Sequence, residues 1–254
     1  SDGKILVAGT TRGTSGGENL AVIRYEKMGK VDTTFGSGGR VLIQIGSSIV
    51  GTARINLRAD GKIVVAGYGR VNDQFRIVVA RLNSNGSFDS TFGTNGRLTL
   101  GVGSIAEGLL FSDLALQNDG KIVLGCLGTV NGSFDFVLIR LNSNGSADTA
   151  FGTGGKLTLS LSSGDDRLHT IAIQSDGKIL AGGSVSLQFG ESRVGMARFN
   201  GDGTLDTTFG KNGTTIPTQT KLNMEARAIL VQTDGKIIAA GGSHSNFAAT
   251  RLQA

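Results

Sequence analysis

The sequence contains no tryptophan, one proline, two tyrosines and a single cysteine. That cysteine, Cys126, excludes an internal disulfide and cannot build a metal site by itself. It follows Val-Leu-Gly in an apolar run, so we expect a small buried side chain. No apolar run approaches the roughly 18 residues of a membrane-spanning helix, and no signal-like segment opens the chain. We therefore expect no membrane span and no signal segment within these residues.

The net charge of +5 is spread along the chain without a cluster of lysine and arginine. Proteins that bind nucleic acid usually concentrate such residues on one face or along one helix. A nucleic-acid partner is therefore not expected. What the sequence does contain is glycine, at 41 of 254 positions, which is typical of an all-β protein with many tight turns.

Most of the sequence is a repeat. The segment 82–97 returns almost letter for letter at 141–156, and recognisably at 31–40 and 199–213. An Asp-Gly-Lys string and a short apolar run precede each copy. The strings start at Asp2, Asp60, Asp119, Asp176 and Asp234, so the steps are 58, 59, 57 and 58 residues. A fixed period of this length indicates a repeat architecture, which we expect to form one domain over residues 1–254.

Each period is predicted to contain four short strands. Asp-Gly between apolar runs favours a hairpin, because both residues tolerate the positive φ of a type I′ turn. No window shows a 3.6-residue apolar period over a helix length, so the predicted class is all-β. The expected first strands of the repeats are 55–58, 114–117, 170–174 and 228–232, and an example of a second strand is 62–66. The expected third strands are 21–25, 76–82, 136–141, 194–199 and 247–252. The fourth strands include 97–100 and 156–159.

Four antiparallel strands per period are typical of a β-propeller blade. A β-helix is the competing architecture, but its coils are shorter and do not use Asp-Gly hairpins. The pattern predicts eighteen strands, against twenty for five complete blades and sixteen for four. We favour five four-stranded antiparallel blades with incomplete termini, as in a fragment of a longer array. We expect the open strand edges either to remain exposed or to cause self-association.

The repeat unit reads Gln-x-Asp-Gly-Lys-Ile-x-x-Ala-Gly-Gly, and later Ala-Arg-Leu-Asn-x-Asn-Gly-x-x-Asp-x-x-Phe-Gly-x-x-Gly. This unit resembles the delta-60 repeat of bacterial surface and secreted proteins, and its layout is similar to the NHL propeller repeat. The resemblance covers essentially the whole chain. It implies a propeller, commonly in large exported bacterial proteins, with no established catalytic activity. The first copy departs from the pattern, with Glu-Lys-Met-Gly-Lys-Val-Asp at residues 26–32.

Three residue types recur with the repeat and are predicted to be scaffold. An arginine can bridge the following carboxylate or cap turn carbonyls, and a phenylalanine before glycine can pack between blades. A residue that is present in every blade is interpreted as structural rather than as a unique site. The arginines are Arg24, Arg81, Arg140, Arg198 and Arg251, the aspartates are Asp32, Asp89, Asp148 and Asp206, and the phenylalanines are Phe35, Phe92, Phe151 and Phe209.

Motifs for metal binding and catalysis are weak. The segment 200–206 resembles half of a calcium loop, but it lacks the later bidentate glutamate, and Asx-turns explain the same residues. The polar segment 163–169 is predicted to be a solvated loop. Carboxylates of a glycosidase could come from Asp165, Asp166, Glu107 or Glu191, although spacing alone does not bring them together. We expect no catalytic set, no cofactor and no metal.

The loops differ between the two ends of the expected blades. Turns between first and second strands, and between third and fourth, are nearly identical across repeats, whereas the other connections differ in length and content. Divergence on one face of a rigid scaffold is typical of a binding face, although drift without constraint would produce the same contrast. The candidate binding residues are Arg12, Glu18, Arg54, Tyr68, Arg70, Asp73, Glu107, Asp113, Asp165, Asp166, Arg167, His169, Glu191, Arg227 and His244.

Three functions are compatible with these patterns. The preferred hypothesis is a non-catalytic binding or scaffold module of an exported or cell-surface bacterial protein, which mediates protein interaction or adhesion and has a protein or a surface glycan as partner. The first alternative is a lectin-like domain with one shallow site per blade, which is disfavoured by the lack of tryptophan. The second alternative is a hydrolase that uses carboxylates, which would need two carboxyl groups about 5 to 10 Å apart in one pocket.

Overall fold

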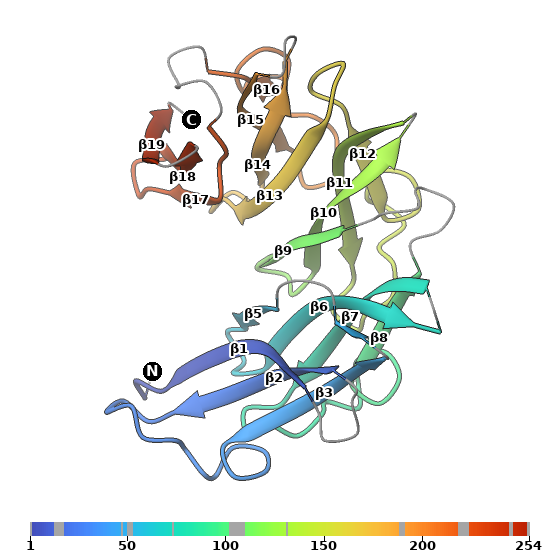
Figure 1. Ribbon diagram of the computed structural model, residues 1–254, viewed down its shortest axis with the longest axis vertical. Coiled ribbons are helices and arrows are strands. Elements are labelled where there is room, and N and C mark those ends of the chain that lie inside the picture. Colours follow the sequence, from blue (N-terminus) through green and yellow to red (C-terminus); the bar gives the residue numbers. More distant parts are fainter. Residues whose placement is uncertain are drawn as a thin grey trace. The chain divides into compact units, whose positions relative to one another are not determined.

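The computed structural model describes residues 2–12, 18–46, 48–49, 53–72, 74–101, 110–130, 132–187, 191–217, 224–243 and 246–252 (Figure 1). Regular structure in these segments consists of β-strands, which confirms the all-β prediction. Nowhere in the described part of the chain is there a helix with the length and apolar character to cross a membrane. Two compact units are formed, one by residues 1–103 with 143–146, the other by 104–142 with 147–254. The expectation of one domain stays a prediction.

The first unit contains two antiparallel sheets. Strands β4 and β5 both pair with β6; β5 corresponds to the expected first strand of this repeat, whereas β4 lies before it, where no strand was predicted. The first sheet is β1 (Ile5–Arg12), β2 (Glu18–Tyr25) and β3 (Arg40–Gly46), and the second is β4 (Ser48–Ile49), β5 (Arg54–Leu57), β6 (Ile63–Val71), β7 (Gln74–Leu82) and β8 (Arg97–Gly101).

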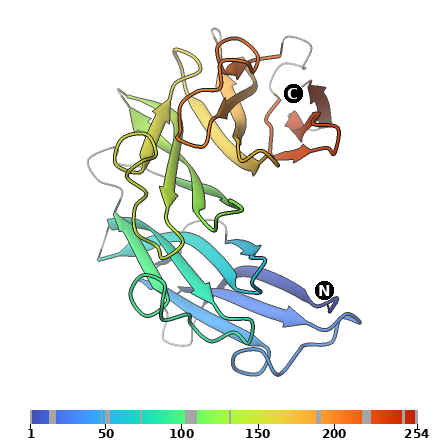
Figure 2. The ribbon, with the colours of Figure 1, turned by 180° about the vertical axis from the view of Figure 1, so that it is seen from behind.

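The second unit contains three antiparallel sheets, whose strands lie side by side in chain order in both views (Figures 1 and 2). The first is β9 (Leu110–Leu116), β10 (Ile122–Val130), β11 (Ser133–Leu141) and β12 (Lys156–Leu159); the next is β13 (Asp166–Ile173), β14 (Ile179–Ser186), β15 (Ser192–Phe199) and β16 (Thr214–Thr215); the last is β17 (Ala228–Val231), β18 (Ile237–Ser243) and β19 (Asn246–Leu252).

The predicted strand order is confirmed, with three strands in the described part of the first and last sheets. The described residues contain one strand more than the pattern predicted, because β4 forms in a connection where no strand was expected. Self-association through open strand edges stays a prediction.

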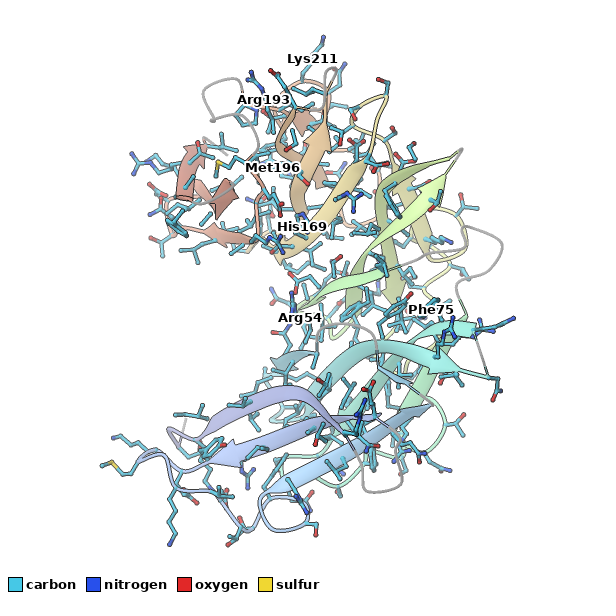
Figure 3. The ribbon with its side chains drawn as sticks, in the orientation of Figure 1. Arg54, Phe75, His169, Arg193, Met196 and Lys211 are labelled. Atoms are coloured by element: carbon cyan, nitrogen blue, oxygen red, sulfur yellow. The ribbon has the colours of Figure 1, made fainter. Side chains whose placement is uncertain are left out.

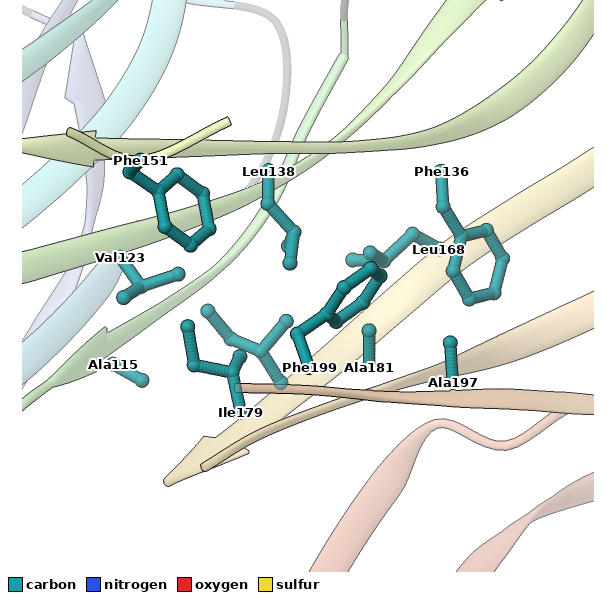
Figure 4. Packing of buried hydrophobic residues seen from close by; sticks show 11 residues of the cluster. Ala115, Val123, Phe136, Leu138, Phe151, Leu168, Ile179, Ala181, Ala197 and Phe199 are labelled. Carbon is teal, nitrogen blue, oxygen red and sulfur yellow. The ribbon is translucent and has the colours of Figure 1, made fainter. Parts of the chain in front are cut away.

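Apolar side chains fill the space between neighbouring sheets of each unit. In the second unit Phe136, Phe151, Leu168 and Phe199 belong to one cluster of buried side chains (Figure 4). A glycine in the second strand of the repeat lets the sheets approach: a Cβ on Gly125 would lie 2.7 Å from Leu168 Cδ2. Cys126, the next residue, is fully buried as predicted, and burial raises the pKa of its thiol.

The recurring arginine and aspartate form an ion pair in each of the first four repeats. The Arg81 Nε donates to Asp89 Oδ2 at 2.7 Å, and the pairs Arg24–Asp32, Arg140–Asp148 and Arg198–Asp206 have the same length. The lysine of the Asp-Gly-Lys string reaches the same carboxylate, as in Lys62 Nζ to Asp89 Oδ2 at 2.8 Å. Burial alone would raise the pKa of Asp89, but hydrogen bonds from Lys62 and Thr91 outweigh it and hold this pKa well below its usual range.

Each of these guanidinium groups also lies over the phenylalanine that follows. The Arg Cζ to ring-centroid distances are 4.6, 4.8, 4.4 and 4.8 Å in chain order. The four rings are almost completely buried, which confirms their prediction as packing wedges. A cation over a desolvated ring contributes about 1–2 kcal/mol. The arginine therefore links the carboxylate, the turn and the core within one repeat.

The same arginine contacts the turn of the following repeat. We call the Asn-x-Asn-Gly turns and their counterparts, at 26–29, 83–86, 142–145 and 200–203, the recurring turns. The Nη1 atoms of Arg24, Arg81 and Arg140 donate to the carbonyls of Ser84, Ser143 and Gly201. The amides of Gly36, Gly93 and Gly152 donate to Asn85, Asn144 and Asp202 at 2.8, 2.9 and 3.1 Å. We call this pair of donors, one guanidinium and one glycine N–H, the turn slot of a repeat.

Because of the turn slots, replacing glycine by alanine should lower the free energy of unfolding by different amounts at two equivalent turn positions. Gly29 and Gly86 both have positive φ, 81° and 90°, but a Cβ on Gly86 would lie 2.7 Å from Gly36 N, whereas one on Gly29 meets nothing within 4 Å. Gly29→Ala should lower the free energy of unfolding by about 1–2 kcal/mol from the left-handed backbone. Gly86→Ala should cost about 1–3 kcal/mol more, because its turn must leave the slot. Urea denaturation measures both, and equal losses would contradict the slot.

The third repeat lacks one hydrogen bond that the others have. Thr34, Thr91 and Thr208 each donate a hydroxyl to their aspartate at 2.6–2.7 Å, but the equivalent residue beside Asp148 is Ala150. Ala150→Thr should therefore raise the free energy of unfolding by about 0.5–1.5 kcal/mol, the net value of one hydrogen bond. The matched change Thr91→Ala should lower it by a similar amount. Thermal and urea unfolding of both variants check the expectation, which fails if Ala150→Thr is neutral or destabilising.

Candidate functional site

In each unit, the candidate binding residues that the structure describes lie toward the end of the sheets that we call the variable end. It holds the loops between second and third strands and the connections from one sheet to the next; the opposite, recurring end holds the recurring turns and Asp-Gly hairpins. Asp73, Glu107 and His244 lie outside the described residues. The other twelve candidates are placed by the structure in one of the two units.

In the first unit the candidates form small local contacts. Arg12 and Glu18 face each other across β1 and β2, with Nη2 and Oε1 3.9 Å apart. Arg70 lies over the ring of Phe75, 5.0 Å from its centroid, and Phe75 stacks on Tyr68 at 5.2 Å. Tyr68 is buried, and burial raises its pKa to about 12. Its expected place among exposed binding residues was wrong, because β6 is buried along most of its length.

Arg54 and Glu191 have less specific surroundings. Arg54 is half-buried at the start of β5 (Figure 3). Glu191 precedes β15, and its backbone carbonyl accepts a hydrogen bond from Leu187 N at 2.7 Å, which closes the loop between β14 and β15.

Three predicted carboxylates of the second unit hold loops together. Asp113 accepts from Ile171 N at 2.9 Å, and so joins β9 to β13. Asp165 accepts from Phe134 N at 3.1 Å and from Arg167 Nη2 at 3.0 Å. Asp166 is fully buried and accepts from two backbone amides and one hydroxyl of the loop before it, including Ser162 Oγ at 2.6 Å. The prediction of a solvated loop at 163–169 was therefore wrong from Asp166 onward, where β13 begins.

A fourth carboxylate, Asp135 on β11, was missed. It is 5 % exposed, and its Oδ1 has no hydrogen-bond partner among the described residues. Burial raises its pKa, a hydrogen bond with Ser160 opposes that change, and the charges of Asp166 and Asp165 raise it further. The only sequence signal was a charged residue between two phenylalanines of a predicted strand, which also fits an exposed position.

His169 and Arg227 are brought together although they come from different repeats. His169 lies at a β-bulge of β13, where the pairing with β14 shifts register (Figure 3). Its Nε2 is 3.4 Å from Ser184 Oγ and 3.4 Å from Glu225 Oε2, and the latter oxygen is 2.7 Å from Arg227 Nη2. Burial lowers the pKa of His169; Glu225 opposes this, and Arg227 and Arg167 lower it further. Glu225 was missed because it faces His169 only through the bulge.

The arrangement does not match a nucleophilic triad. In a Ser–His–acid relay the hydroxyl and the carboxylate lie at opposite ring nitrogens, whereas here Ser184 and Glu225 lie near the same one. We therefore interpret these four side chains as an ionic cluster. In the described part of the chain no three His, Cys, Asp or Glu side chains are grouped so that they could hold a metal ion.

Comparisons with known proteins give distant likenesses only. No curated protein matches the chain. A protein of unknown function from Bacteroides caccae is 10 % identical over 92 % of this chain and 70 % of its own, with a TM-score of 0.48. An endo-arabinase from Bacteroides thetaiotaomicron is 12 % identical over 97 % and 93 %, with a TM-score of 0.48. A hypothetical protein from Leishmania major is 13 % identical over 100 % and 86 %, with a TM-score of 0.41. These likenesses carry no argument about function.

A family match is more informative. The family described as a "domain of unknown function (DUF5122) beta-propeller" matches residues 1–35, 58–92, 117–151 and 174–209, together more than half of the chain. Each matched segment contains one Asp-Gly-Lys string and the ion-paired arginine, aspartate and phenylalanine of that repeat. This agrees with the delta-60 resemblance and confirms the prediction of a propeller built from antiparallel blades. The chain therefore belongs to the DUF5122 β-propeller family.

Proposed function

We propose that this propeller is a non-catalytic binding module of an exported or cell-surface bacterial protein, and that it binds an acidic protein surface through its variable end. The observation that carries the proposal is how charge is distributed there. In the ion pairs Arg227–Glu225 and Arg167–Asp165 the guanidinium is the more exposed member, at 65 % against 35 % and 45 % against 35 %. In both pairs the guanidinium offers a larger share of its surface to solvent than the carboxylate does.

These arginines have the features of interface residues. Arg167 lies over the ring of Phe134, 4.7 Å from its centroid, and its Nη2 is fixed by Asp165. A guanidinium that is already stacked and paired loses little side-chain entropy when it binds. Arginine and aromatic residues are enriched among the residues that dominate binding energy. Arg227 adds a second exposed guanidinium in the same unit, and the unit therefore supplies two cationic anchors at its variable end.

The hydrolase alternative receives less support from the same residues. A glycosidase needs two carboxyl groups that face one bond. Asp166 accepts from three donors of the loop before it, and Asp165 accepts from Phe134 N and Arg167 Nη2, so both carboxylates are engaged in holding the structure. The cluster at His169 lacks the geometry of a relay. Both observations favour binding over catalysis.

The lectin alternative depends on exposed aromatic faces. Among the described aromatic residues, Tyr68 and Phe111 are buried, and Phe247 is 80 % exposed. Sugars dock on rings whose polar edges also form hydrogen bonds, which phenylalanine cannot provide. A protein partner therefore remains the better-supported proposal.

The binding surface is tested with two charge-matched double variants. Labelled chain is titrated against intact cells of the producing organism and against their extracted surface proteins. Arg167→Ala with Arg227→Ala should weaken saturable binding by about tenfold or more, because anchor arginines contribute more than about 1 kcal/mol each. Lys30→Ala with Lys211→Ala removes the same charge from exposed residues at the recurring end and should leave binding unchanged. Equal effects of the two double variants would refute the proposed surface.

Localisation is tested separately on the parent protein. Antibodies against the propeller should detect it in the cell-surface fraction or the cleared supernatant of the producing organism. A cytosolic marker enzyme in the same fractions controls for lysis. Detection in the cytosol alone would overturn the proposed location, whatever the binding experiment shows.

A further inference from the structure

A histidine accompanies the two arginines of the proposed binding surface. His169 and Arg167 lie on either side of the fully buried Leu168 in β13, and both side chains reach solvent, at 19 % and 45 % exposure. His169 occupies the bulge of this strand, and a bulge commonly re-aims a side chain (Figure 3). The charges of Arg167 and Arg227 both act on its imidazole. A side chain that can change charge near neutral pH is thus part of a cationic surface.

The segment that carries Glu225 and Arg227 is fixed by its backbone. The amides of these two residues donate to carbonyls of β18 at 3.0 and 2.8 Å, and the amide of Ala226 between them donates to a carbonyl of β14 at 3.3 Å. Ala226 is fully buried, whereas the side chain of Arg227 is 65 % exposed. The backbone therefore holds Glu225 beside His169, and the exposed guanidinium is able to change its partner without a movement of the main chain.

Two nitrogen atoms approach one oxygen of Glu225. Its Oε2 lies 2.7 Å from Arg227 Nη2 and 3.4 Å from His169 Nε2. This oxygen is buried, and despite both ionic contacts it accepts no hydrogen bond from a described residue. A buried acceptor in this state is costly. A protonated imidazole, in which both ring nitrogens are donors, would give it a charge-assisted hydrogen bond.

In the free chain the surroundings of His169 oppose its protonation. Burial lowers the pKa of His169, the carboxylate of Glu225 opposes this change, and the two arginines lower the pKa further. On the neighbouring strand β14, the hydroxyl of Ser184 lies 3.4 Å from Nε2 and adds no charge. An anion placed on the arginines would cancel their repulsion, and the pKa of the imidazole would then rise.

We propose that an acidic partner draws Arg227 away from Glu225 when it binds, and that His169 takes up a proton from solvent and replaces the arginine at this carboxylate. This inference rests on the proposed function, because it concerns the same surface. Before binding, Glu225 is paired with the guanidinium; afterwards it is paired with the imidazolium, and the guanidinium with a carboxylate of the partner. No charge is left unpaired in either state. Because binding and protonation are linked reciprocally, the affinity for an acidic surface rises as the pH falls.

A rhodamine-labelled hexa-aspartate peptide tests the coupling by fluorescence anisotropy with the intact chain. Affinity is measured at pH 5.5 and pH 8, between which histidine changes charge and the aspartates stay ionised. The wild-type chain should bind at least about fivefold more tightly at pH 5.5. His169→Gln should bind with the same affinity at both pH values. Asp135→Asn is the matched control: it removes a different buried titratable group of the same unit and should keep the pH dependence.

NMR spectroscopy gives a second measurement that does not depend on the folding of one variant. The chain has two histidines, and the spectrum of His169→Gln identifies the imidazole signal of His169 in the wild-type chain. A saturating amount of hexa-aspartate should raise the pKa of His169, because the anion neutralises the arginines. Arg227→Gln imitates the departure of the arginine, and should raise this pKa without any peptide.

The results separate the coupling from the proposed function. Equal affinity of the wild-type chain at both pH values, or a pH dependence that survives in His169→Gln or disappears in Asp135→Asn, overturns the coupling and leaves the acidic-partner surface in place. A pKa of His169 that the bound peptide does not raise overturns it as well. If the peptide binds at neither pH, the surface is wrong and the coupling falls with it. If the coupling is found but Arg167→Ala with Arg227→Ala leaves binding to cells unchanged, the coupling is upheld and the proposed protein partner is wrong.

Discussion

The structure depends on one guanidinium–carboxylate pair that recurs in four successive repeats. A buried ion pair stabilises a fold only when the remaining donors and acceptors of both groups are also satisfied. Here the carboxylate of Asp89 has Arg81, Lys62 and Thr91 around it. The guanidinium has the carboxylate, the Thr91 hydroxyl, the Phe92 ring and the carbonyl of Ser143. Because every partner is supplied by the repeat itself or by its neighbour, stability is transmitted from one repeat to the next.

Local and periodic features could be predicted from the sequence, and features that need two repeats to meet could not. The Asp-Gly hairpins, the strands and the scaffold role of Arg81, Asp89 and Phe92 are visible because each signal returns at the same position. The contact between His169 and Glu225 depends on a bulge in β13 and on pairing with another sheet, which no periodicity encodes. Tyr68 was misplaced for a related reason: its strand extends further into the buried region than its polar hydroxyl suggested.

The two ends of the sheets use carboxylates in opposite ways. At the recurring end they are gathered under arginine and lysine, in contacts that are the same in each repeat. At the variable end Asp113, Asp165 and Asp166 accept mainly from backbone amides, and each does so in a different way. The two ends of the sheets thus hold carboxylates with different partners, charged side chains at one end and mainly backbone amides at the other.

The turn slots recognise main-chain carbonyls, which every amino acid carries. Ser84, Ser143 and Gly201 differ in their side chains, yet each offers the same oxygen to the arginine of the preceding repeat. Any repeat that retains the glycine of its turn can consequently follow any other. Gene segments of this period can be duplicated, lost or exchanged by recombination without a new interface having to evolve, so the length of such an array is free to change while the chemistry of each junction stays constant.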